Sequence, residues 1–178
     1  MSTLTFRPAR VEDATPLSAL VNSAYRGDSS RQGWTTEADL LDGQRVNEPV
    51  LVEMMGRPGS VILLCQRDGE LAGCVYLERR EAGAYLGMLT VRPDLQAAGI
   101  GRHLLGAAEA HAAMEWHAAA IVMTVIHQRT ELIAWYERRG YRDTGRREPF
   151  PSKDQLSVRK VDNLDMVVLS KPLPPPGA

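Results

Sequence analysis

The sequence predicts an α/β fold, in which a mixed and mostly antiparallel sheet carries helices on both faces. Three observations predict it. A short strand and several helical segments come first, a meander of three strands follows, and helices then alternate with strands towards the end of the chain. Such an order favours one sheet with helices packed on its faces, because each strand must bury its apolar side chains.

The first third of the chain is expected to contain one strand and three helices. In order, these are a strand at residues 3–7, a helix at 11–25, a loop at 26–35, and short helices at 37–41 and 48–55. Apolar side chains recur at helical spacing in the first helix, at Leu17, Leu20, Val21 and Ala24. Thr36 stands where the N-cap of the second helix would be, since its hydroxyl can accept a hydrogen bond from a free backbone N–H.

The middle and the end of the chain supply the other strands. A meander is expected at 61–67, 71–78 and 84–91, with a hairpin turn at Asp68-Gly69. There follow a helix that begins near Gly99, an apolar strand at 119–126 that we expect to be buried on both faces, a short helix at 131–138, and strands at 141–144 and 164–170. Residues 1–172 thus form one domain, and the proline-rich residues 173–178 form a disordered tail.

Length and composition fit one folded domain and exclude several classes of protein. The chain has 178 residues and a net charge of -1, so no overall basic field would draw it to nucleic acid or to an anionic membrane. No apolar run approaches the ~20 residues that span a bilayer, and the first residues lack the order of a signal peptide. Cys65 and Cys74 are interpreted as reduced core residues of a cytoplasmic protein. The histidines form no cluster with cysteine, so we expect no metal site.

The segment at residues 89–105 carries the chemical signal. A strand runs into a loop of small residues, and the loop opens a helix. Free backbone N–H groups at a helix start, together with the helix dipole, bind phosphate without a lysine. Gly99 and Gly101 allow a bulky anion to approach the backbone closely because no Cβ stands in the way, and Arg102 can add a charged contact.

Two other phosphate-binding motifs fit this segment less well. A dinucleotide fingerprint needs a third small residue where Leu104 stands, and a nucleoside triphosphate loop needs Gly-Lys-Ser/Thr. Taken alone, the two glycines fit a phosphate site and a turn that only packs a helix onto a strand equally well. The surrounding residues favour the phosphate site.

Two motifs in the sequence resemble those of the GCN5-related N-acetyltransferase (GNAT) family. Val91-Arg92-Pro93 followed by Gln96-x-x-Gly99-x-Gly101 is similar to its pyrophosphate-binding motif, usually written Q/R-x-x-G-x-G/A. Residues 134–141, Ala-Trp-Tyr-Glu-Arg-Arg-Gly-Tyr, resemble its second signature, an aromatic-Tyr-x-x-x-Gly-aromatic run. The order of strands and helices also matches the family over roughly residues 4–172.

The resemblance implies a sheet that splits between its fourth and fifth strands and binds acetyl-coenzyme A there as co-substrate. The residues it assigns to the coenzyme are Leu89, Thr90, Val91, Gln96, Ala97, Ala98, Gly99, Ile100, Gly101 and Arg102. Backbone groups of residues 89–91 would pair with the pantetheine arm, and residues 96–102 would hold the pyrophosphate. Tyr136 matches the tyrosine that stands beside the coenzyme sulfur and acts as general acid.

Two positions depart from the family pattern. Arg129 stands where the family often has an asparagine that contacts the coenzyme. The third strand of the meander, around Tyr85 and Met88, carries no glutamate where many members keep a general base. The base is therefore unassigned, and a route through water takes its place.

The loop at residues 25–37 is the candidate acceptor site, because in the resembled family the segment between the first two helices lines that site. Trp34 and Glu37, with Tyr25 at the start of the loop, could hold an amine by ring stacking and charge. Alternatively, Trp34 only fills the edge of the core and Glu37 only favours a helix N-terminus. Residues 148–151 form a second candidate wall, or a surface loop with one apolar anchor at Phe150.

The function that these residues predict is transfer of an acetyl group from acetyl-coenzyme A to a primary amine, without metal. The neutral amine attacks the thioester directly, a backbone N–H near Leu89 stabilises the oxyanion, and Tyr136 assists the departing thiolate. The expected acceptor is a small molecule, and a homodimer is left open. Two alternatives remain: a protein or peptide acceptor on the same fold, and a regulatory module that binds acyl-coenzyme A without catalysis.

Overall fold

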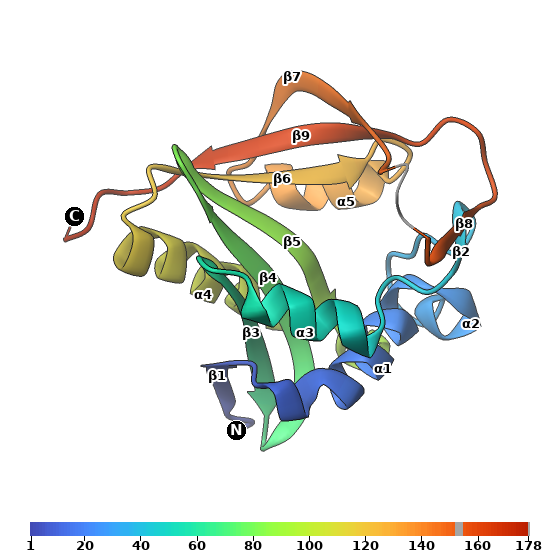
Figure 1. Cartoon of the computed structure of the whole chain (residues 1–178), viewed down its shortest axis with the longest axis horizontal. Coiled ribbons are helices and arrows are strands. Elements are labelled where there is room, and N and C mark those ends of the chain that lie inside the picture. The colour runs from blue at the N-terminus through green and yellow to red at the C-terminus, as the bar shows by residue number, and fades with distance from the viewer. Residues whose placement is uncertain (152–154, 178) are drawn as a thin grey trace.

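The structure, a computed structural model, describes residues 1–151 and 155–177 (Figure 1). Its strands are β1 (Leu4–Pro8), β2 (Leu41–Gly43), β3 (Ser60–Arg67), β4 (Glu70–Arg80), β5 (Gly83–Val91), β6 (Ala120–Ile126), β7 (Arg142–Pro149), β8 (Ser157–Arg159) and β9 (Asp165–Pro172). Its α-helices are α1 (Ala14–Tyr25), α2 (Gly27–Ser30), α3 (Glu48–Gly56), α4 (Ile100–Trp116) and α5 (Thr130–Glu137). Short 3₁₀ turns precede α1 and α4.

The main sheet has the strand order β1-β3-β4-β5-β6-β9-β7. Its neighbours pair antiparallel except β5 and β6, which are parallel because α4 connects them as a crossover. That parallel pair is formed only at Ala84 with Ile121 and at Tyr85 with Val122. Beyond Tyr85 the two strands diverge, and Figure 1 shows β4 and β5 splaying away from β6 and β9. The split that the sequence predicted therefore lies between β5 and β6.

Helices cover both faces of the sheet, as the sequence predicts. Alternating residues of β3 point to opposite sides: Ile62 and Leu64 pack in a cluster with α1 and α3, whereas Leu63 and Cys65 pack in a cluster with α4. The second cluster continues beneath α5 and includes Tyr136. The side chains of β6 alternate between buried and half-buried, so this strand is less buried than its apolar run predicts.

A bulge interrupts β5 where it passes the split. The register with β4 shifts between Cys74 and Tyr76, and Met88 has a φ of +53°. Residues other than glycine rarely adopt this left-handed backbone conformation. Contacts with neighbouring residues must therefore stabilise the bulge. The buried hydroxyl of Thr90 provides part of it by donating to the carbonyl oxygen of Met88 over 3.0 Å.

The helix predicted at residues 37–41 is wrong. Thr36 does accept the backbone N–H of Ala38, and the N–H of Leu41 bonds to the carbonyl of Glu37, but the chain then leaves the helical path after this one turn. Leu41 is buried where β2 pairs with β8, two short strands that the sequence did not reveal. The predicted loop at 26–35 also holds the single turn of α2. Tertiary pairing outweighs local propensity in such short segments.

The proline-rich end begins with a residue that packs onto the domain. Leu173 is buried, and its N–H donates to the carbonyl of Ala119 over 2.8 Å. Disorder of the remaining tail stays a prediction, and its last residue, Ala178, lies outside the described residues. Within residues 1–151 and 155–177, no helix is long and apolar enough to cross a membrane.

Candidate active site

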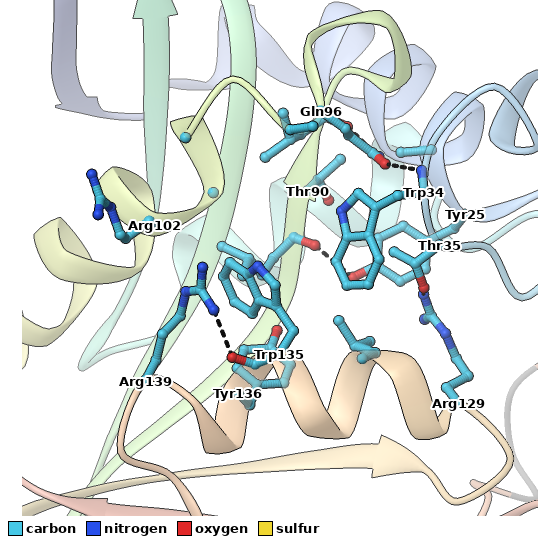
Figure 2. A pocket seen from close by; sticks show the side chains of 17 residues that line it. Tyr25, Trp34, Thr35, Thr90, Gln96, Arg102, Arg129, Trp135, Tyr136 and Arg139 are labelled. Atoms are coloured by element: carbon cyan, nitrogen blue, oxygen red, sulfur yellow. Dashed lines mark hydrogen bonds between the residues drawn. The ribbon is translucent and has the colours of Figure 1, made fainter.

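A cavity of about 210 Å³ opens where β5 and β6 separate (Figure 2). It lies between the end of β5, the turn before α4, helix α5 and the loop after α2. Eight of the residues that the sequence assigned to the coenzyme line it: Leu89, Thr90, Val91, Gln96, Ala97, Gly99, Gly101 and Arg102. Ile100 instead points into the core, and Ala98 lies on a separate surface hollow. The cavity therefore runs along the strand end and the helix start that the motif predicted.

The N-terminus of α4 forms the part of the cavity that suits an anion. Gly99 has a φ of +81°, which only glycine adopts readily, and this conformation starts the helix. Within the described part of the chain, no acceptor bonds to the backbone N–H groups of residues 99–102. A Cβ on Gly101 would lie 3.5 Å from both Val91 and Trp135, within the space between them. Free N–H groups and an open backbone fit a pyrophosphate.

Two arginines flank this helix start without a carboxylate partner among the described residues (Figure 2). Arg102 is exposed on the first turn of α4, and Arg139 follows α5. The guanidinium of Arg139 lies 3.7 Å from the centre of the Trp135 ring and donates to the Trp135 carbonyl, while its Nε–H is buried without a partner. Burial and the charges of Arg138 and Arg102 lower the pKa of Arg139. A bound anion would relieve this repulsion.

Gln96 has a structural task that the motif did not specify. Its Nε2 donates to the Val91 carbonyl over 3.1 Å, and its Oε1 accepts the backbone N–H of Trp34 over 3.0 Å. The side chain therefore ties the end of β5 to the loop after α2. That loop places the Trp34 ring 6.4 Å from the Trp135 ring, and Figure 2 shows the two indoles at the cavity mouth.

Tyr136 lines the cavity from α5. It is only 5% exposed and borders both this cavity and a second one. Its ring is held edge-on between Trp135 and Tyr141. Among the described residues nothing hydrogen-bonds to its hydroxyl, and burial raises its pKa well above the usual value of a phenol. The hydroxyl is therefore a protonated donor, free to bond to a ligand in the cavity.

The second cavity, of about 160 Å³, lies on the other side of Tyr136. It is lined by residues 86–89 of β5, residues 123–126 of β6, and Phe150 and Pro151. Tyr25 separates the two cavities, and its hydroxyl donates to the Leu89 carbonyl at the β5 bulge over 2.8 Å. One wall is polar: Glu37 is buried between Arg26 and Arg129, and it accepts a hydrogen bond from each.

Comparison with known proteins identifies the family. The Acetyltransferase (GNAT) domain model matches residues 28–150, well over half of the chain. The chain belongs to the GNAT acetyltransferase family. It is an acetyl-coenzyme A-dependent N-acetyltransferase. No curated protein matches it in sequence.

Solved GNAT structures share the fold over almost the whole chain. The ribosomal-protein-S18-alanine N-acetyltransferase of Escherichia coli is 16% identical, with a TM-score of 0.70 over 98% of this chain and 97% of that one. A putative acetyltransferase of Salmonella typhimurium, solved with acetyl-coenzyme A, is 18% identical, with a TM-score of 0.66 over 98% and 96%. A spermidine N-acetyltransferase chimera derived in part from Vibrio cholerae is 15% identical, with a TM-score of 0.65 over 95% of each. At these identities the likeness concerns the fold.

The structure separates two residues that the sequence analysis had placed together in the acceptor site of this GNAT enzyme. Trp34, 44% exposed, lines the first cavity beside Gln96 and Trp135. Glu37 lines the second cavity, with both carboxylate oxygens engaged by arginines. The two side chains therefore line different cavities, and a joint role in binding one amine stays a prediction. Glu37 is buried, and no regular helix begins at it. The alternative that Glu37 only favours a helix N-terminus is therefore corrected.

Sequence reasoning missed the places of Arg139 and Arg45 at the site, and it did not predict the contacts of Arg129. Arg139 belongs to the second motif, but only the fold brings it next to the N-terminus of α4. Arg129 donates to Thr35 as well as to Glu37, so the departure from the family asparagine links α5 to the loop after α2. Arg45 lines the second cavity from the loop after β2. Nothing near Arg45 in the sequence marks it, because its neighbours in space come from α1 and β5.

Proposed function

We propose that this GNAT enzyme transfers the acetyl group to a primary amine of a small molecule, by direct attack of the amine. The observation that carries the proposal is the meeting of two cavities at Tyr136. One cavity has the features of a phosphate site at its far end. The other is lined by Phe150 and Pro151 and, among the described residues, by one carboxylate, which is already paired. A pocket of about 160 Å³ with little negative charge supports a small acceptor, whereas a long acidic groove would have supported a protein chain.

The residues of the first cavity fit the coenzyme along its length. The backbone N–H groups of residues 99–102, with Arg102 and Arg139, would hold the pyrophosphate. On the edge that faces β6, β5 has no strand partner beyond Tyr85 among the described residues, and this edge would accept the pantetheine arm as an added strand. Trp34 and Trp135 would close the mouth and exclude water. When bound, acetyl-coenzyme A supplies a thioester, whose carbonyl carbon accepts the amine nitrogen and whose sulfur leaves.

Tyr136 would serve the leaving sulfur as a hydrogen-bond donor. A phenol normally titrates near 10 and a thiol near 8.5, so proton transfer from tyrosine to thiolate is uphill even in water. Burial raises the pKa of Tyr136 and widens this gap. Donation of a strong hydrogen bond, without full transfer of the proton, is therefore the role that fits the hydroxyl.

The proton of the amine would leave through water. Among the described residues, Glu37 is the one carboxylate that lines the second cavity, and its two oxygens already accept hydrogen bonds from Arg26 and Arg129. This arrangement supports the route through solvent that the missing glutamate on β5 suggested.

Release of free coenzyme A thiol with a panel of amines tests the proposal. Amino acids, polyamines, aminoglycosides and short peptides should differ, with at least one small amine giving thiol release well above the rate without acceptor. Binding of acetyl-coenzyme A should be measured on the same protein by calorimetry. Acetylation of peptides alone would support the protein acceptor instead. Tight binding without thiol release from any amine would support the regulatory module and contradict the proposal.

A further inference from the structure

The second cavity carries an excess of positive charge. Of the described residues that line it, Arg26, Arg45 and Arg129 are cationic and Glu37 is anionic. Three positive charges and one negative charge leave a formal surplus of two positive charges. The whole chain has a net charge of -1, so this surplus is local. A cationic pocket repels a cationic ligand and attracts an anionic one.

Two of these arginines are held in place by burial. Arg26 and Arg129 are only 5% and 7% exposed and share the carboxylate of Glu37. One carboxylate neutralises one guanidinium, and the Nε–H of each arginine is buried without a partner among the described residues. Arg26, Glu37 and Arg129 together therefore place a net positive charge in a poorly solvated wall of the cavity. The electrostatic attraction of such a charge for an anion is stronger there than in water.

Arg45 is the cation of this group that remains open to a ligand. Its side chain is half-buried, and among the described residues no carboxylate lies within ion-pairing distance of it. Its backbone is fixed by Asn22 of α1, whose Oδ1 accepts the N–H groups of Arg45 and Val46 and whose Nδ2 donates to the Val46 carbonyl. The guanidinium lies 5.5 Å from the centre of the Tyr25 ring. The chain thus holds an unpaired cation beside the residue that separates the two cavities.

The geometry points to an acceptor that carries a carboxylate as well as its amine, as an amino acid does, with Arg45 as the residue that binds the carboxylate. This inference rests on the proposed acetyl transfer and adds the chemical class of the acceptor. The coenzyme does not account for Arg45, because its phosphates have Arg102 and Arg139 in the first cavity, which Arg45 does not line. Polyamines and other multiply cationic acceptors are disfavoured by the same charge surplus.

Matched pairs of amines test the inference. Each pair consists of an amino acid and its carboxamide, which share the side chain and the position of the amine. We expect kcat/KM for the acid to exceed that for the amide about tenfold or more, the usual effect of one charge-assisted contact. The amide has the less basic amine, so more of it is neutral at a given pH, and the comparison is biased against this result.

Variants of Arg45 connect the preference to this residue. Arg45→Gln should remove most of the preference for the acid, chiefly through a higher KM, and Arg45→Lys should retain part of it. Arg57→Gln, which removes one positive charge from an exposed ion pair after α3, is the matched control and should leave the preference unchanged. A hydroxy acid that lacks the amine gives a readout without turnover: calorimetry should detect its binding to the wild-type protein and weaker binding to Arg45→Gln.

The possible results distinguish the carboxylate inference from the proposed acetyl transfer. Robust transfer to amides and acids alike, unaffected by Arg45→Gln, would overturn the carboxylate inference and leave the acetyl transfer standing. Preference for polyamines would do the same. Absence of thiol release from every amine, in a protein that binds acetyl-coenzyme A, would overturn both.

Discussion

Burial of Tyr136 determines which proton donor is present in the split. Tyr136 is enclosed by aromatic rings, yet no described residue bonds to its oxygen. The oxygen is not among the fully buried polar atoms that lack a partner, so it is accessible to a ligand in the cavities that Tyr136 lines. The protein therefore maintains a protonated phenol whose partner must come from the ligand. The sequence motif predicted the residue, and the fold shows that its pKa is raised rather than lowered.

Tyr136→Phe should lower kcat about 10²-fold, the usual scale for loss of a general acid or donor. The ring remains and only the hydroxyl goes, so the melting temperature and the affinity for acetyl-coenzyme A should change little. Single-turnover kinetics, under conditions where chemistry limits the rate, are the measurement. A Phe variant that keeps most of its kcat would show that the thiolate takes its proton directly from solvent.

The pH dependence of kcat should reflect the raised pKa of Tyr136. Because burial raises this pKa, the hydroxyl keeps its proton as the pH rises through the range where an ordinary tyrosine begins to ionise. The rate should increase with pH as the amine loses its proton, and no descending limb should appear up to about pH 10. A descending limb below pH 9 that Tyr136→Phe removes would mean that the hydroxyl titrates early and contradict this assignment.

Glu37→Gln should destabilise the protein. The change leaves Arg26 and Arg129 facing one another without their shared anion, and removal of one member of a buried ionic group typically costs about 3 kcal/mol or more. Denaturant unfolding measures the loss. Glu53→Gln, in an exposed ion pair with Arg57, should change the free energy of unfolding by less than about 1 kcal/mol. Normal stability with a raised KM for the acceptor would instead restore Glu37 as an amine-binding residue.

At the scale of elements, the strand–turn–helix unit of β5 and α4 forms most of the coenzyme cavity. Residues with positive φ bend the chain near the end of β5, at Met88, and in the turn before α4, at Ala97 and Gly99. Tyr25 and Gln96 then fix its carbonyl groups at Leu89 and Val91. Periodicity and glycine placement predicted the helix start within one residue. The bulge was not predicted, because Met88 has no sequence feature that marks a left-handed conformation.

Gly101→Glu should weaken binding of acetyl-coenzyme A at least about a hundredfold, the effect of losing two or so charge-assisted contacts. The new side chain would enter the space between Val91 and Trp135 and bring a negative charge to the pyrophosphate site. Folding should persist, since an acidic residue in the first turn of a helix interacts favourably with the dipole. Gly101→Gln is the matched control for size, and calorimetry should show a smaller loss with it. Equal affinities for the wild type and the Glu variant would remove the phosphate assignment.

At the scale of the whole molecule, the two halves of the sheet are joined by a short parallel contact. Only two residue pairs connect β5 to β6. A ligand that lies in the split would contact β5 and α4 on one side and α5 on the other, so it would bridge the halves. The apparent stability of the protein should therefore depend on the coenzyme.

Acetyl-coenzyme A at a hundred times its Kd should raise the melting temperature by about 5–11 °C. A ligand that binds only the folded state stabilises it by about 2.7 kcal/mol at that concentration, and 1 kcal/mol corresponds to about 2–4 °C in a domain of this size. Differential scanning fluorimetry gives the shift. Gly101→Glu, measured beside the wild type, should lack it. A shift of the same size in both proteins would place the ligand elsewhere.

The sequence by itself determined the elements with strong patterns: the meander with its Asp68-Gly69 turn, both of whose residues have positive φ, and the helix that opens at Gly99. It also determined the family, since short motifs of fixed spacing survive at low overall identity. Only the tertiary structure decided that residues 41–43 form a strand, that Glu37 is paired with two arginines, and that Arg45 lies beside Tyr25 with no carboxylate partner among the described residues. These features depend on contacts between segments far apart in the chain. Local propensity, which acts over a few residues, contains no information about which distant charges meet.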